Sequence, residues 1–177
     1  MRSMTYNGAL TREQFLFYEI RIAARFFMQG VTLDDAIQTI TAQNLFQFPT
    51  EREVRSIARA CYRRLGALEN DTLVCELAEA PTEIAKQINL YAIMRDNRLV
   101  WDFMVDFIGE KYRNLDLILT RPELNVFMTE LQTRDEKAAT WSESTIKKIR
   151  GVLVRILVET GYLESPRHNA QTCLSPR

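Results

Sequence analysis

The sequence predicts an all-α protein, a compact bundle of about eight helices. Three observations lead to this fold class. Helix-capping patterns recur along the chain, and apolar residues return at helical spacing with almost no strand-like alternation. Only 6 Gly and 5 Pro interrupt 177 residues, and 46% of the residues are hydrophobic, which is enough to build a core.

The first two expected helices have clear ends. Thr11 and Gln14 have capping-box spacing, and Gly30 is a suitable stop for the helix that follows them. The second helix is expected at 32–43 and leads into a loop at 44–49.

The third and fourth helices are also bounded by capping residues. Thr50 and Glu53 form a capping box at the start of the third helix, and Gly66 is expected to end it. Asn70 is a suitable N-cap for a short fourth helix, which Pro81 ends.

The fifth and sixth helices are expected at 82–95 and 98–113. The sixth is the expected centre of the bundle, because apolar residues cover most of its circumference. These residues are Leu99, Val100, Trp101, Phe103, Met104, Val105, Phe107 and Ile108.

A short apolar connector at 116–119 precedes the seventh helix, which starts at 120 and ends before Thr133. A polar loop is expected at 134–139. Thr140 and Glu143 then form a capping box for an eighth helix, with Gly161 as its stop.

The predicted organisation is an N-terminal helical subdomain at 1–68, a C-terminal helical subdomain at 69–163 and an irregular tail at 164–177. The net charge is zero, but its distribution is uneven. Residues 1–64 carry 9 basic and 6 acidic groups, residues 65–136 carry 7 and 14, and residues 137–177 carry 7 and 3. Two basic ends can therefore present anion-binding surface on a neutral protein.

Several functional classes are disfavoured. Cys61, Cys75 and Cys173 are widely spaced and His168 is the one histidine, so neither a zinc site nor a Ser-His-Asp triad is expected. Phosphate-binding glycine motifs are missing. Free thiols, and the lack of a signal peptide or a membrane span, predict a cytoplasmic protein. We expect no enzyme activity, cofactor, metal or small-molecule substrate.

A metal site is a weak alternative, because three carboxylates recur every four residues at Asp102, Asp106 and Glu110. They have the spacing to hold a divalent cation from one helix face. A solvated stripe, or pairing with Arg95, Arg98 or Arg113, is the simpler interpretation.

The third helix carries the clearest candidate site. Arg52, Arg55, Arg59 and Arg63 fall within an arc of roughly 80°, because each residue of a helix advances by about 100°. Apolar side chains occupy the opposite face. Guanidinium groups form paired hydrogen bonds with phosphate, so this row is a candidate DNA-binding surface. A plain solvated face, partly paired with first-turn glutamates, is the alternative.

The eighth helix has a similar pattern. Lys147, Lys148 and Arg155 cluster on one side with Gly151 between them. A glycine inside a helix costs about 1 kcal/mol, so close approach of either a phosphate backbone or a neighbouring helix is expected there. The seventh and eighth helices also weakly suggest a helix-turn-helix, although their connection is longer than that motif uses.

Arg21 and Arg25 form a third basic group, on the first helix amid Phe15, Phe17 and Tyr18. Such aromatic residues can stack on nucleobases. At helical spacing they more often belong to the core.

Several short segments resemble a known family. They are Tyr62-Arg63-Arg64-Leu65 with Leu68; Glu83-Ile84-Ala85-Lys86-Gln87 with Leu90-Tyr91-Ala92; Asp102-Phe103 with Val105; and Trp141-Ser142-Glu143-Ser144-Thr145, Lys147-Lys148, Leu153-Val154-Arg155-Ile156-Leu157, Glu159 and Gly161-Tyr162-Leu163. In their order and spacing, from Leu10 to about Leu163, the chain resembles the BrxA family of BREX phage-defence systems.

The resemblance implies an all-α architecture similar to NusB, no catalytic activity, and DNA binding through basic surface. It also implies work beside other BREX components, which include a methyltransferase and ATPases. Two alternatives stay open: a protein–protein adaptor within the BREX complex, and an RNA-binding module like NusB.

Overall fold

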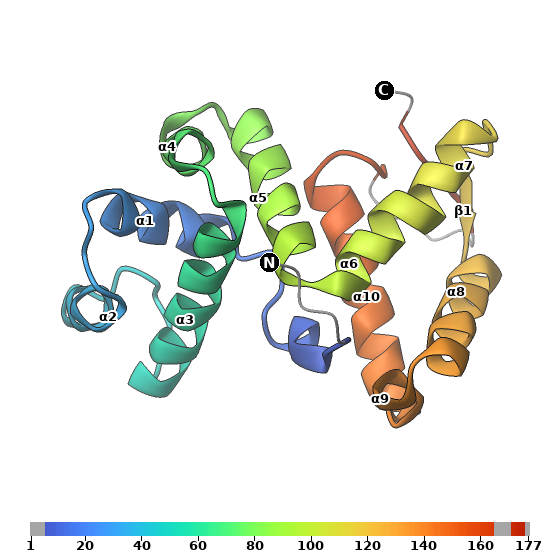
Figure 1. Ribbon diagram of the computed structural model, residues 1–177, viewed down its shortest axis with the longest axis horizontal. Coiled ribbons are helices and arrows are strands. Elements are labelled where there is room, and N and C mark those ends of the chain that lie inside the picture. Colours follow the sequence, from blue (N-terminus) through green and yellow to red (C-terminus); the bar gives the residue numbers. More distant parts are fainter. Residues whose placement is uncertain (1–5, 165–170, 176–177) are drawn as a thin grey trace. The chain divides into compact units, whose positions relative to one another are not determined.

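A computed structural model describes residues 6–164 and 171–175. The chain divides into two units (Figure 1). Unit 1 contains Phe15–Asp96, and unit 2 combines the preceding segment with the chain from Asn97 onward. Almost all regular structure is helical, so the predicted all-α class is confirmed. No described helix is long and apolar enough to cross a membrane.

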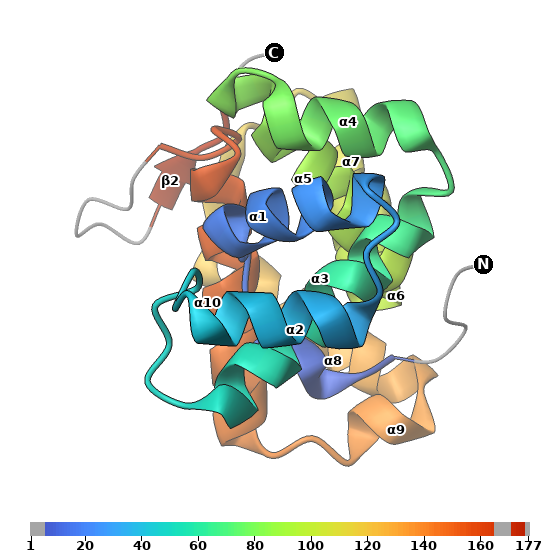
Figure 2. The ribbon, with the colours of Figure 1, turned by 90° about the vertical axis from the view of Figure 1, so that its left-hand side faces the viewer.

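Unit 1 contains five helices. They are α1 (Phe17–Met28), α2 (Leu33–Ala42), α3 (Glu51–Leu68), α4 (Asp71–Glu79) and α5 (Thr82–Asp96). Helix α1 packs against α3 and α4, and α3 also packs against α2 and α5 (Figures 1 and 2). Their apolar faces meet in one core that includes Ile20, Ile40, Cys61, Leu65 and Leu77.

Unit 2 begins with a short 3₁₀ helix, η1 (Gly8–Thr11), which packs against α10 (Glu143–Glu159). The expected sixth helix is a continuous run of α6 (Arg98–Asp102), the π-helical η2 (Phe103–Ile108) and α7 (Gly109–Arg113). Helices α8 (Arg121–Arg134) and α9 (Glu136–Ala139) lead into α10. Phe103, Phe107 and Phe127 form an aromatic cluster between η2 and α8.

The sixth helix is less enclosed than its composition predicted. Leu99, Val100 and Phe103 are fully buried, but Val105 and Asp106 are exposed. Apolar residues on most sides of this helix therefore do not mean that other helices cover all of those sides.

The predicted division after residue 68 differs from the observed one, which falls between Asp96 and Asn97. Helices α4 and α5 bury their apolar faces against α1 and α3, so they belong to the first core. The segment before Phe15 belongs instead to the second unit, where Leu10 is buried.

The predicted start of the first helix at Thr11 is wrong. The chain forms η1 there, Leu16 takes a left-handed conformation with φ 50°, and α1 starts at Phe17. Leu10 is buried and belongs to unit 2, whereas the buried Phe15 belongs to unit 1, so the break in the helix accompanies the change from one unit to the other.

Gly66 does not end the third helix. Helix α3 continues to the buried Leu68 and ends where Glu69 takes φ 50°, with its carboxylate 2.6 Å from Arg95 of α5. Burial of Leu68 favours the two extra helical residues.

The capping box expected at Thr140 and Glu143 is also wrong. Ser142 caps α10 by accepting a hydrogen bond from the Thr145 amide, while the Thr140 hydroxyl donates to the Lys137 carbonyl. The expected polar loop contains α9, whose Ala138 is fully buried.

The tail is not wholly irregular. Strand β2 (Gln171–Cys173) pairs antiparallel with β1 (Ile118–Thr120), which lies in the expected connector. Leu119 and Leu174 are buried, which explains why this segment returns to the unit. His168 lies outside the described residues.

Candidate nucleic-acid interface

Helix α3 is amphipathic as predicted. Val54, Ile57 and Leu65 are buried, whereas Arg52, Arg59 and Arg63 are exposed and Arg55 is half-buried. The Thr50 side chain accepts from the Glu53 amide and sets the start of the helix. The backbone therefore places the four arginines on one side, but their partners differ.

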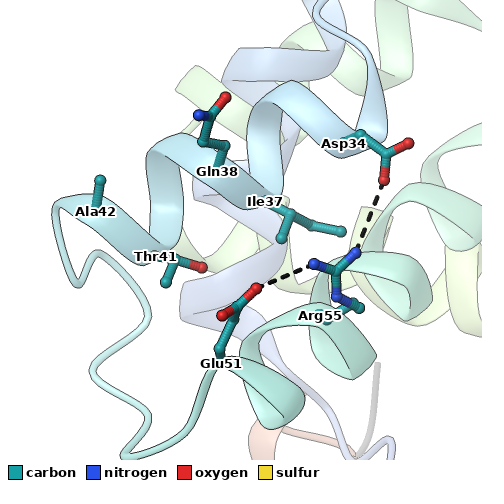
Figure 3. A pocket seen from close by; sticks show the side chains of 7 residues that line it. All are labelled: Asp34, Ile37, Gln38, Thr41, Ala42, Glu51 and Arg55. Atoms are coloured by element: carbon teal, nitrogen blue, oxygen red, sulfur yellow. Dashed lines mark hydrogen bonds and ion pairs between the residues drawn. The ribbon is translucent and has the colours of Figure 1, made fainter.

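Arg55 lies between two carboxylates. Its Nη2 is 3.0 Å from Oε1 of Glu51, and its Nη1 is 4.0 Å from Oδ1 of Asp34 in α2 (Figure 3). The three side chains line a hollow of about 650 Å³ between α2 and α3. Because two carboxylates accompany one guanidinium, this hollow is unfavourable for phosphate.

Arg63 is held more tightly. Its Nε and Nη2 donate to the two carboxylate oxygens of Asp96, at 2.7 and 2.9 Å. This partner belongs to α5 and lies 33 residues along the chain from Arg63, so the spacing within the third helix did not indicate it. No ion pair within the described chain involves Arg52 or Arg59, so these two retain the charge that the row was expected to present.

The basic pair of the first helix is divided between two roles. Arg21 donates to the carbonyls of Ala78 and Ala80, at 2.8 and 3.0 Å, and satisfies the C-terminal end of α4. Arg25 is largely exposed and lies 3.7 Å from Glu79. Phe15 is buried, as expected for a core residue, although Tyr18 is 57% exposed.

Helix α10 presents an open basic face. Lys147, Lys148, Gly151 and Arg155 are all exposed, while Ile149, Leu153 and Ile156 are fully buried on the other side. Among the described residues, no carboxylate lies within ion-pair distance of either lysine. Arg155 donates to the Gln14 side-chain oxygen, a neutral partner that leaves its positive charge in place.

Gly151 is open to its surroundings. A Cβ added there meets no atom within 4 Å. A closely packed helix of the described chain is therefore not the reason for this glycine.

Arg150 was missed by the sequence analysis. It lies with Lys147 beside a hollow of about 640 Å³ between α8 and α10, to which Asn125 and Gln132 of α8 also contribute. The residues of α8 are separated from Arg150 by a turn and a short helix, so no single helical pattern could have grouped them.

The remaining cluster of charges in unit 2 is structural. The buried Lys111 amine lies 2.6 Å from both Asp116 and Glu123, and Glu123 also completes the capping box with Thr120. The hydrogen bond from Lys111 lowers the pKa of the Asp116 carboxyl. The cluster connects α7, β1 and α8.

The carboxylates of the sixth helix do not converge. Asp102 accepts a hydrogen bond from Tyr6 and pairs with Arg98 at 3.5 Å, whereas Asp106 and Glu110 are exposed. No group of His, Cys, Asp or Glu suited to a metal occurs among the described residues.

These features define an all-α protein of two helical units with exposed cationic faces on otherwise buried helices. The BrxA family matches residues 4–176, and the chain therefore belongs to the BrxA family of BREX systems.

Known proteins agree over most of their length. The chain is 30% identical to "BREX protein BrxA" of Bacillus cereus (strain H3081.97), over 97% of this chain and 85% of that protein. It is 26% identical to "BREX protein BrxA" of Paramagnetospirillum magneticum (strain ATCC 700264 / AMB-1), over 82% and 72%. A crystal structure of an uncharacterized Magnetospirillum magneticum protein has the same fold, with a TM-score of 0.81 at 23% identity, over 97% and 86%.

Proposed function

We propose that this chain is a non-enzymatic DNA-binding accessory protein of a BREX phage-defence system, and that it contacts the phosphate backbone of duplex DNA through basic helix faces. The observation that carries the proposal is the exposed face of α10, where no ion pair within the described chain involves Lys147 or Lys148. Ammonium groups without a carboxylate partner keep their full attraction for phosphate.

Arg155 and Gly151 extend this face. Arg155 lies two turns beyond Lys147, and its neutral partner Gln14 leaves its charge in place. Gly151 has no side chain to keep a phosphate backbone at a distance. Within unit 1, Arg52 and Arg59 are the corresponding cations on α3. A smaller contribution is expected from the arginines that other groups of the chain already bind, which are Arg21, Arg25, Arg55 and Arg63.

The test is a duplex-DNA binding titration at several salt concentrations. Log affinity is expected to fall linearly with log salt, with a slope of about 0.9 for each phosphate contacted. Replacing Lys147→Glu together with Lys148→Glu should reduce that slope by about 2 and weaken binding strongly. Arg55→Gln is the control, because its charge is already compensated.

A salt-independent interaction, or equal affinity of the double variant and the wild type, would contradict the assignment of α10. Competition by single-stranded RNA tests the RNA-binding alternative in the same assay. Stronger retention of RNA than of duplex DNA would favour that alternative.

An adaptor role beside the BREX methyltransferase or ATPases is a second candidate. It is favoured by exposed apolar side chains in unit 2, where Leu115 is 84% and Ile118 45% exposed. Large apolar side chains left in water are typical of protein interaction sites. Co-purification that Leu115→Ser abolishes while duplex binding persists would support it.

A further inference from the structure

The hollow between α8 and α10 combines three kinds of chemistry. Its volume of about 640 Å³ is in the range of sites that hold a small organic molecule. The partly buried Ile146 supplies apolar surface, next to Met128, which is itself buried at 1% exposure. Lys147 and Arg150 supply positive charge, and Asn125 supplies an amide.

The charges favour an anion at the α10 side of the hollow. Lys147 and Arg150 face one lining carboxylate, that of Glu143, and no ion pair of the described chain involves any of the three. The hollow therefore has a net positive charge, unlike the hollow between α2 and α3, where Asp34 and Glu51 outnumber Arg55. Guanidinium and ammonium groups are the usual protein ligands of phosphate.

The α8 side favours a polar, planar group. In the described chain no hydrogen bond uses the side-chain amide of Asn125, so it can both donate to and accept from a base edge. Gln132 donates to the Ala138 carbonyl, which leaves its own oxygen as a further acceptor.

We propose that this hollow binds one unpaired nucleotide, with its phosphate at Lys147 and Arg150, its base against Ile146, and its base edge at Asn125. A paired base inside a duplex is stacked on both faces and cannot enter such a hollow. The inference rests on the proposed function in that α10 meets nucleic acid. A free mononucleotide offers the same chemistry.

The experiment compares two DNA ligands with the full chain: a blunt duplex and the same duplex with a short single-stranded overhang. Calorimetric titrations with AMP, GMP, CMP and TMP form a second arm. The overhang duplex is expected to bind about tenfold more tightly, which corresponds to about one charge-assisted hydrogen bond. Binding of mononucleotides without an overhang preference identifies a free nucleotide as the occupant.

Three variants separate the hollow from the basic face. Asn125→Ala and Arg150→Gln are expected to remove most of the overhang preference while blunt-duplex affinity changes little. Thr129→Trp, at an exposed lining position, fills the hollow and should have the same effect. Lys148→Gln, which lies on α10 outside the hollow, should weaken both duplexes equally and keep the preference.

Equal affinity for both duplexes, with no mononucleotide bound, overturns the proposal, as does an overhang preference that survives both Asn125→Ala and Thr129→Trp. Circular dichroism of each variant checks that the helices are retained. Salt-sensitive binding of the blunt duplex reports on the proposed function alone, so the two proposals can fail separately.

Discussion

Helices α3 and α10 have the same pattern and different surfaces. Each buries one apolar face and places basic residues on the other. On α3, carboxylates from α2, α5 and α3 itself pair with Arg55 and Arg63. On α10, Lys147 and Lys148 have no such partner in the described chain. Helical spacing therefore indicates which face a charge occupies, but not whether that charge remains available.

The largest expected effect tests whether each face depends on its own core. Leu153→Ala in α10 and Leu65→Ala in α3 each remove a fully buried side chain, and each should cost about 2–5 kcal/mol of unfolding free energy. Urea unfolding measures this loss. If the α10 face binds DNA, Leu153→Ala should weaken DNA binding more than Leu65→Ala does at the same urea concentration. Equal weakening by the two variants would contradict a greater role of α10 than of α3 in DNA binding.

Acid is expected to affect unit 2 through the cluster at Lys111. The hydrogen bond from Lys111 lowers the pKa of the Asp116 carboxyl. The interaction therefore stabilises the folded state fully above the carboxyl's ordinary pKa of 3.8. This stabilisation is lost as the pH falls through the lower pKa of the folded state. Replacing Asp116→Asn should lower stability at neutral pH and flatten the acid limb of the stability curve. Thermal unfolding between pH 2 and pH 7, roughly the range over which carboxylates titrate, measures both. An unchanged acid limb would assign acid sensitivity to other carboxylates.

A smaller effect is expected from removing the carboxylates beside α3. Glu51→Gln with Asp34→Asn should release Arg55 from both of its carboxylate partners and raise duplex affinity several-fold, since exposed ion pairs are worth about 0.2–1 kcal/mol each. The salt slope should steepen as more phosphates are contacted. The matched control is Glu136→Gln with Asp71→Asn, which removes two exposed carboxylates, on α9 and α4. The same gain in the control would indicate a general charge effect rather than a released arginine.

The smallest expected effect is that of Gly151→Ala. The position is helical, exposed and free of neighbours, so alanine should stabilise the protein by about 0.5–1 kcal/mol. A methyl group there should also hinder close approach of a phosphate backbone and weaken DNA binding modestly. The corresponding Gly66→Ala in α3, where an added Cβ also meets nothing within 4 Å, should stabilise without that loss. Equal DNA affinity for both variants would remove Gly151 from the contact surface.

Local signals predicted much of the helical structure correctly. The second helix begins after Thr32, the third after Thr50 and the fourth after Asn70, and each of these side chains accepts a capping hydrogen bond. Such caps involve groups three residues apart, so they are visible in the sequence. The errors at Thr11 and Gly66 arose where burial of nearby apolar residues, Leu10, Phe15 and Leu68, against distant parts of the chain decided its local path.

The amino-acid sequence by itself determined the all-α class, most helix starts and the faces on which the basic residues lie, because these depend on neighbours within one or two helical turns. Only the tertiary structure decided that Asp96 pairs with Arg63, that Arg21 binds the end of α4, and that Arg150 and Asn125 line the same hollow. Charge compensation depends on atoms within about 4 Å, and folding brings those atoms together from distant parts of the chain.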